Sequence, residues 1–190
     1  MTRATSSAPA RTSSRAPDRG VIRVEAGSHF PVPARDGFDY ITDPPNWLEY
    51  WPRAVSVDPD TRWKRPDDRA RVTLRLAGRR VALDMTLVRI DPYRLVEYTS
   101  EQAGLPAARH RRHFDERAGE LAYRIVVEYE PRQGWRGLLD RSLVRKATER
   151  AVRETLANLH ERFRRSGPKG VVSHLVTKNA AKEAPEPSAD

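Results

Sequence analysis

Residues 71–85 read RVTLRLAGRRVALDM, and this stretch decides what kind of fold the chain can form. Apolar and polar residues alternate on both sides of Gly78, which is typical of two β-strands that each bury one face. A two-residue turn over Gly78 and Arg79 predicts an antiparallel hairpin, with Leu76 opposite Val81, Leu74 opposite Leu83 and Val72 opposite Met85. These six apolar side chains then share one face. The other face carries Arg71, Thr73, Arg75, Arg80, Ala82 and Asp84.

A second hairpin is expected where residues 108–115 and 120–130 flank Arg117-Ala118-Gly119. If Phe114 lies opposite Leu121, Arg112 faces Tyr123 and His110 faces Ile125 on the inner surface. The apolar face of its second strand consists of Leu121, Tyr123, Ile125, Val127 and Tyr129.

The strand between these two hairpins has an ambiguous pattern. Val88 and Ile90 compete with Leu87 and Val96 for the buried side. A β-bulge adds one residue to one strand of a pair, so a bulge here would reconcile both sets.

Three further segments complete the predicted order. Residues 22–32 alternate as a first strand, and short helices follow over 34–42 and 46–51, separated by Pro44-Pro45 because proline disfavours helical neighbours. Residues 135–165 carry an apolar stripe at helical spacing, which predicts a long helix that Ser166-Gly167-Pro168 stops. The stripe consists of Val144, Ala147, Thr148, Ala151, Val152, Thr155, Leu156, Leu159 and Phe163. We expect a bend or a separate first turn near residue 140, since Trp135, Leu138, Leu139 and Leu143 are out of phase with the stripe.

Composition excludes several classes of protein. The chain has 190 residues, a net charge of +9 and no Cys, which excludes disulfides, a thiolate nucleophile and Cys-ligated metals. It has no apolar run near the ~20 residues of a spanning helix and no apolar secretory core, so we expect a cytoplasmic protein. Most of the basic residues are arginines, and they are spread along the chain. Nucleic-acid binding needs clustered positive charge, so this distribution indicates a solvated surface.

The chain divides into one domain and two tails. Residues 1–20 are expected to be disordered and residues 166–190 mostly disordered, since they offer little apolar surface to bury, apart from a short apolar patch at 171–176. Residues 21–165 have the size of one domain with a core. The tails carry charges of +3 and 0, which leaves +6 spread over the domain.

The predicted order is a strand, two short helices, about six antiparallel strands and a long C-terminal helix. This α+β order resembles the helix-grip fold of the START-like (SRPBCC) superfamily, of the polyketide cyclase/dehydrase type. Four segments are similar to family motifs: residues 32–52, with Asp43-Pro44-Pro45-Asn46-Trp47; the turn at Asp91-Pro92; residues 119–131; and residues 153–163. The resemblance covers about residues 21–165.

The resemblance implies a curved sheet of six to seven strands wrapped round the long helix and enclosing an apolar cavity. Members bind lipids, polyketides, isoprenoid quinones or hormones, and some cyclise or dehydrate aromatic polyketides. None of the matching motifs contains a catalytic residue, so none is assigned, and no cofactor is expected.

The candidate ligand-binding residues are Trp51, Met85, Tyr98, His110, Arg112 and Tyr123. Arg112 carries the most information, because a buried charge needs a partner. A ligand carboxylate, phenolate or enolate would provide one, and so would Glu97 or Asp84. In the alternative, residues 109–112 form an open strand edge and are a basic surface. No metal site is expected, since side chains three apart on a strand diverge, as those of His110 and His113 would.

Three functions remain open at this point. The first is binding of a hydrophobic small molecule or lipid in the cavity, without chemistry. The second is an enzyme of the cyclase/dehydrase kind that steers a polyketide through aldol closure with Arg112 and Tyr123. The third is a basic interaction protein whose tails contact anionic membrane or, less favoured, nucleic acid.

Overall fold

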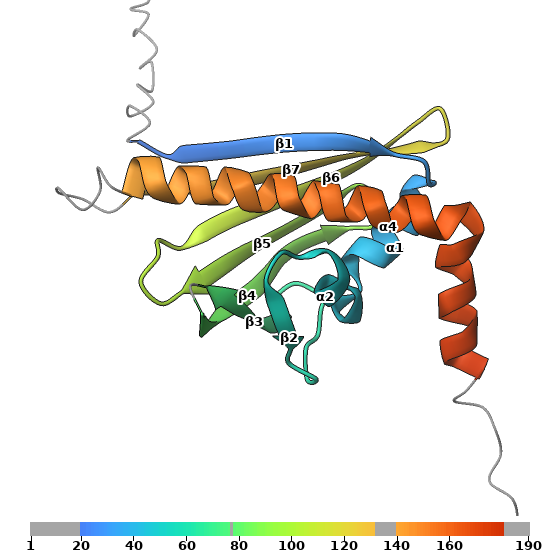
Figure 1. Cartoon of the computed structure of the whole chain (residues 1–190), viewed down its shortest axis with the longest axis horizontal. Coiled ribbons are helices and arrows are strands. Elements are labelled where there is room, and N and C mark those ends of the chain that lie inside the picture. Colours follow the sequence, from blue (N-terminus) through green and yellow to red (C-terminus); the bar gives the residue numbers. More distant parts are fainter. Residues whose placement is uncertain (1–19, 77, 132–139, 181–190) are drawn as a thin grey trace, which may run out of the picture.

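The computed structural model describes residues 20–76, 78–131 and 140–180. Seven antiparallel strands form one sheet in the order β1-β7-β6-β5-β4-β3-β2, and the long helix α4 runs along it beside β1 (Figure 1). The strands are β1 (Ile22–Phe30), β2 (Ala54–Val57), β3 (Arg69–Leu76), β4 (Arg79–Asp91), β5 (Leu95–Gln102), β6 (Ala108–Arg117) and β7 (Glu120–Tyr129). The helices are α1 (Ala34–Thr42), η1 (Pro44–Asn46), α2 (Trp47–Tyr50), η2 (Asp140–Val144) and α4 (Arg145–Ala180). The predicted helix-grip fold is confirmed.

The two short helices form a tight corner between β1 and β2. α1 has the predicted bounds and ends where Pro44 and Pro45 begin η1. The carbonyl of Ile41, which the end of a helix leaves without a backbone partner, accepts hydrogen bonds from Trp47 Nε1 at 3.0 Å and Tyr50 Oη at 2.7 Å. Both aromatic side chains are fully buried, so they lock α2 onto α1.

Both predicted hairpins form, but their registers differ from the prediction by two residues. Leu76 pairs with Arg79 rather than Val81, and Val72 with Leu83 rather than Met85. Because side chains alternate with a period of two, a shift of two keeps every side chain on its predicted face. Alternation alone therefore cannot distinguish the two registers. Ala77, in the turn, lies outside the described residues.

The β6–β7 hairpin is corrected in the same way. Phe114 pairs with Tyr123, Arg112 with Ile125 and His110 with Val127. The turn is formed by Ala118 and Gly119, whose φ angles of 53° and 81° are both positive, as in the type I′ turns that suit the twist of a hairpin. The predicted inner face is unchanged.

The predicted β-bulge is present in β4. The pairing with β5 shifts between Leu87, which lies opposite Tyr98, and Arg89, which lies opposite Glu97. Val88 is the additional residue, and it is exposed. Leu87 and Val96 are consequently both buried, which resolves the conflict in the sequence pattern.

The long helix differs from the prediction at its end. A π-helical turn, η2, precedes α4, in agreement with the expected break near residue 140, whereas Trp135, Leu138 and Leu139 lie outside the described residues. The helix was expected to end at residue 165, but helical backbone continues to Ala180, and Figure 1 shows that its axis changes direction over this part. A proline within a helix removes one hydrogen bond and bends the axis, which is the effect expected of Pro168.

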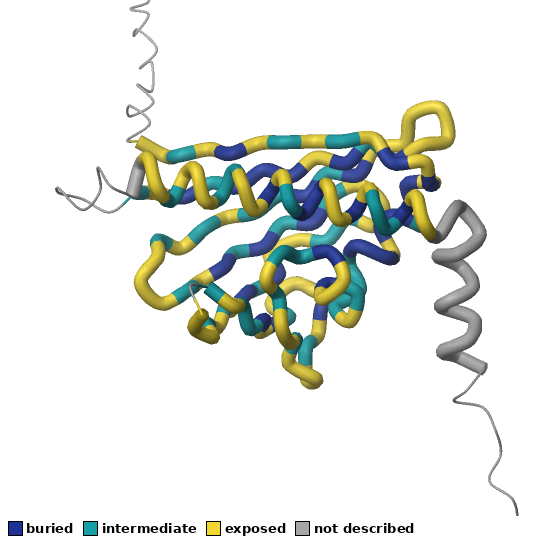
Figure 2. The backbone as a smooth tube through the Cα atoms, viewed as in Figure 1, coloured by how far each residue is buried: buried dark blue, intermediate teal, exposed yellow. Residues whose placement is uncertain are grey.

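The two halves of the predicted stripe on α4 have different environments. Val152, Leu156, Leu159 and Phe163 are buried against the rest of the domain (Figure 2). Ala147 and Ala151, nearer the start of the helix than Val152, are exposed. The helix therefore packs through its middle, and its first turns leave a space between helix and sheet.

Candidate ligand-binding cavity

A cavity of about 450 Å³ lies between the inner face of the sheet and the first turns of α4. Its wall on the sheet is largely aliphatic, and its wall on the helix consists of small or apolar side chains. The sheet contributes Leu74, Leu76, Leu83, Ile125 and Val127, and the helical side contributes Leu143, Val144, Ala147, Thr148, Ala151, Val152 and Thr155. Three polar residues lie next to one another on the wall, because Tyr98 bonds to Arg112 and stacks on His110. The other polar lining residues are Arg53, Gln102, Thr148 and Thr155.

Arg112 is buried on β6, with 7% of its surface exposed, as its predicted place on the inner face requires. Its guanidinium donates hydrogen bonds to the Tyr98 hydroxyl at 2.8 Å and the Tyr50 hydroxyl at 3.2 Å. The guanidinium carbon also lies 5.1 Å from the ring of Trp51 and 5.2 Å from the ring of Tyr98, within the range of cation–π attraction. The alternative of an open basic strand edge is wrong for this side chain.

None of the described carboxylates pairs with Arg112. The two candidates from the sequence are engaged on the other face of the sheet, where Glu97 pairs with Arg109 at 2.9 Å and Asp84 pairs with Arg71 at 2.5 Å. Arginine stays protonated in proteins, so a full positive charge sits in the wall among neutral hydroxyl groups. Its Nε has no hydrogen-bond partner among the described atoms.

Two tyrosines near the guanidinium, Tyr50 and Tyr123, remain in their neutral form. Burial is the main cause that raises the pKa of Tyr50, to about 12, against the opposing effect of the Arg112 charge. Burial likewise raises the pKa of Tyr123 well above its usual value. Neither phenol ionises near neutral pH, so neither neutralises Arg112.

His110 stacks on Tyr98, with ring centroids 4.4 Å apart and planes within 2°. Its Nε2 lies 2.8 Å from the hydroxyl of Ser100. Burial, and then the nearby charge of Arg112, lowers the pKa of His110 to about 3. The ring is therefore neutral at physiological pH.

The six candidate residues from the sequence fall into two groups. Trp51, Tyr98, His110 and Arg112 line the cavity together. Met85 and Tyr123 are fully buried in the core and are not part of its lining. The lining residues of α4 were not among the candidates from the sequence. They do belong to the first half of the predicted apolar stripe, which includes Ala147 and Ala151.

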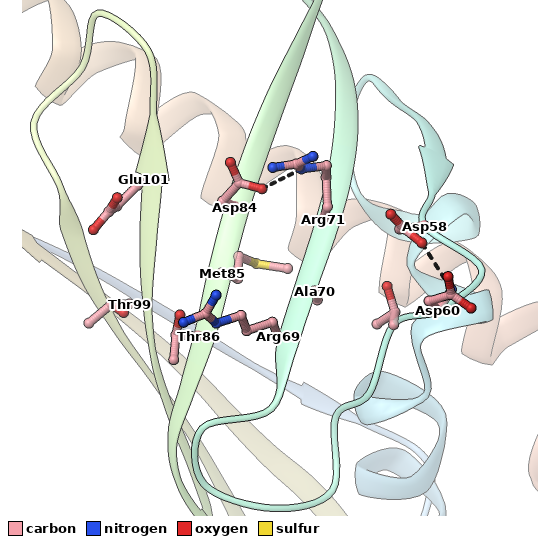
Figure 3. Close-up of a pocket in the computed structure, with 11 residues that line it drawn as sticks. Asp58, Asp60, Arg69, Ala70, Arg71, Asp84, Met85, Thr86, Thr99 and Glu101 are labelled. Carbon is pink, nitrogen blue, oxygen red and sulfur yellow. Dashed lines mark hydrogen bonds and ion pairs between the residues drawn. The ribbon is translucent and has the colours of Figure 1, made fainter.

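A second hollow, of about 540 Å³, lies on the outer face of β3, β4 and β5 (Figure 3). Its lining is mainly polar and charged, and Arg71 and Asp84 pair with each other on the adjacent strands β3 and β4. Asp58 accepts a hydrogen bond from the backbone of Asp60 at its rim. Within residues 20–76, 78–131 and 140–180 no group of three His, Asp or Glu side chains is placed to hold a metal ion. The apolar inner cavity is therefore the better candidate for a ligand site.

The model of the family "Polyketide cyclase / dehydrase and lipid transport" matches residues 21–164. The chain belongs to this family. A search of curated proteins found no match. None of the helices in the described part of the chain is long and apolar enough to cross a membrane.

Solved structures with the same fold include the following three. The protein TTHA0849 from Thermus thermophilus is 20% identical, with a TM-score of 0.63 over 74% of this chain and 96% of that chain. Ara h 8.0201 is 16% identical, with a TM-score of 0.55 over 74% and 99%. The Zhui aromatase/cyclase from Streptomyces sp. R1128 is 12% identical, with a TM-score of 0.57 over 86% and 99%. At these identities the similarity shows the fold alone.

Proposed function

We propose that this protein binds a hydrophobic small molecule or lipid in the inner cavity and holds an acidic oxygen of that ligand against Arg112. The observation that carries the proposal is the buried guanidinium, whose described neighbours are all neutral. Removing a charge from water is costly unless an opposite charge or a set of hydrogen bonds compensates for it. A ligand carboxylate, phenolate or enolate would supply the missing charge.

The rest of the cavity fits the remainder of such a ligand. A volume of about 450 Å³ falls within the usual range of small-molecule sites, about 300–1,000 Å³. Aliphatic walls favour an apolar skeleton, and the adjacent polar groups of Tyr98, His110 and Arg112 orient it. Trp51 and Tyr98 add flat aromatic surfaces beside the charge.

A cyclase is the second candidate, because Arg112 places positive charge where a carbonyl oxygen of a polyketide would become negative. Aldol closure also needs a base that removes a proton from carbon, and an effective base has a pKa near the working pH. Among the described lining residues, His110 is the group closest to this role, and its pKa of about 3 makes it a weak base. These observations favour binding over catalysis.

A matched pair of fluorescent probes tests the proposal. We expect 9-anthracenecarboxylate to bind the purified protein at least about tenfold more tightly than the neutral 9-anthracenemethanol, because leaving a buried charge without its partner costs about 2–5 kcal/mol. Native mass spectrometry after expression in the natural host should show a co-purifying acidic ligand. The proposal fails if neither probe binds, or if the neutral probe binds as well as the anion.

A further inference from the structure

The open end of the cavity carries both apolar and basic side chains. Leu105 and Leu143 line the cavity and yet are 40% and 62% exposed. Arg53 also lines the cavity and is exposed. Arg79 and Arg80, the first two residues of β4, are exposed at the same end of the sheet, Arg79 on the inner face with Leu76 and Arg80 on the outer face with Arg75. We call these five residues, together with the exposed Lys146 of α4, the mouth surface.

The topology of the sheet gathers these residues at one end. In an antiparallel sheet alternate turns lie at the same end, so the β3–β4 turn and the β5–β6 loop are neighbours. Figure 1 shows that the start of α4 lies at that end too. The β4–β5 and β6–β7 turns, with Arg94 and Arg117, lie at the opposite end.

The cations of the mouth surface are uncompensated. None of these four side chains forms an ion pair with another residue of the described part of the chain. Some outer-face arginines are paired, such as Arg23 with Glu25 and Glu128 and Arg109 with Glu97, whereas the exposed outer-face Arg69 and Arg75 form no ion pair among the described residues. Close to the mouth, Glu149 is already paired with Arg145, and Glu101 is the one exposed acid in the adjoining part of β5.

Exposed leucines among unpaired cations match one kind of partner better than the alternatives. An anionic bilayer attracts basic side chains and accepts apolar ones below its headgroups. A second copy of this chain, docked by a two-fold axis, would bring the same cations face to face. Single-stranded nucleic acid requires stacking aromatics, and none of the six residues is aromatic.

We propose that the mouth surface docks this protein on an anionic lipid bilayer, so that the ligand passes between membrane and cavity without crossing water. The part of this inference that concerns ligand transfer rests on the proposed function, because it takes the mouth as the route of the ligand. The docking itself depends on Arg53, Arg79, Arg80 and Lys146 for charge and on Leu105 and Leu143 for apolar contact. It does not require an occupied cavity.

Vesicle co-sedimentation of the full chain tests the charge. We expect binding to phosphatidylcholine vesicles that contain phosphatidylglycerol, weakening with salt, and little binding to phosphatidylcholine alone. Each basic residue near a bilayer changes the partition coefficient about fivefold, so the double variant Arg79→Gln/Arg80→Gln should bind about 25-fold more weakly. The double variant Arg94→Gln/Arg117→Gln loses the same charge at the far end and should change binding less than about threefold.

A second pair of variants tests the apolar contact. Leu143→Ser should weaken vesicle binding about tenfold, the contribution of one buried leucine. Val88→Ser, 42% exposed in the β4 bulge, should leave it unchanged. All four variants are at exposed positions, and circular dichroism checks that they fold.

Three results would overturn the docking proposal. The first is equal binding to neutral and anionic vesicles, and the second is an equal loss in the mouth and far-end variants. The third is duplex DNA binding of the same strength with the same variant pattern, which would indicate a general polyanion surface. If vesicles bind as expected while neither anthracene probe does, the proposed function fails and the docking proposal stands.

Discussion

Replacing Arg112 with methionine separates the two roles that a buried arginine can have. Methionine fills a similar elongated volume without charge. If Arg112 holds an anionic ligand, Arg112→Met should lose binding selectively and keep the fold. If Arg112 is a structural residue, the same change should damage stability and affect all ligands alike.

The expected loss of affinity follows from the environment of the guanidinium. A carboxylate about 4 Å from a unit charge gains about 4 kcal/mol at an effective dielectric constant of about 20. Truncating one member of such a pair costs about 2–5 kcal/mol. We therefore expect the Kd of 9-anthracenecarboxylate to rise about 100-fold, since every 1.4 kcal/mol is about tenfold, and the Kd of 9-anthracenemethanol to change less than about fivefold.

The expected change in stability is small because two opposing contributions nearly cancel. Arg112→Met removes the hydrogen bonds to Tyr98 and Tyr50, each worth about 1.5–3 kcal/mol for a charged donor. It also removes the cost of burying an uncompensated guanidinium, which is several kcal/mol. The free energy of unfolding, measured by urea denaturation, should therefore change by less than about 1.5 kcal/mol.

A matched control is the neighbouring Arg109→Met, which removes an exposed arginine paired with Glu97 on the outer face. It should leave the affinities of both probes unchanged. Our reasoning is refuted if Arg112→Met weakens both probes equally, or if it destabilises the fold by about 3–5 kcal/mol, the cost of breaking a compensated buried charge.

Three further predictions concern the cavity, one titration and one turn. Ala147→Trp should fill the cavity and weaken both anthracene probes more than about tenfold, whereas Ala157→Trp, on an exposed part of α4 outside the lining, should not; fluorescence titration measures both. The unfolded chain binds a proton at His110 below its ordinary pKa, about 6.5, and the folded protein does so only near pH 3. Stability should therefore decline as pH falls from about 6.5 toward 3, and His110→Gln should reduce this decline by more than about 1 kcal/mol in acid denaturation; identical profiles would contradict the burial of a neutral ring. Ala118 has a φ of 53°, so Ala118→Asn should raise the free energy of unfolding by about 0.5–1 kcal/mol in urea denaturation, because asparagine tolerates this conformation; a loss of stability would count against the assigned turn.

The faces of the strands could be predicted from the sequence, but their pairing could not be fixed by alternation. Arg112 and Phe114 lie on the inner face as expected, because side-chain direction depends only on odd or even position. Which residue lies opposite depends on where the turn closes. The positive φ angles of Ala118 and Gly119 fix where the turn closes. Alanine rarely adopts a positive φ, so the sequence does not indicate that Ala118 belongs to the turn.

The cavity itself could be predicted only in part. A helical stripe marks an apolar face, and it does not tell whether that face is covered. On α4 the burial of the stripe changes along the helix, from the exposed Ala147 to the buried Leu159. The sequence also could not show that Arg112 lacks a partner charge. Glu97 is close to it in the sheet, but the Glu97 side chain lies on the outer face and pairs with Arg109.

The way α4 is attached has a consequence for how the protein could change its ligand. The helix packs on the domain through Val152, Leu156, Leu159 and Phe163. Its first turns cover the cavity and are held only from this packed middle part. A small tilt of these first turns alters the depth of the cavity and breaks no hydrogen bond of the sheet. We therefore expect ligand range to be set mainly by residues 143–151, where substitutions can accumulate without loss of the fold, while the polar anchor on β6 stays fixed.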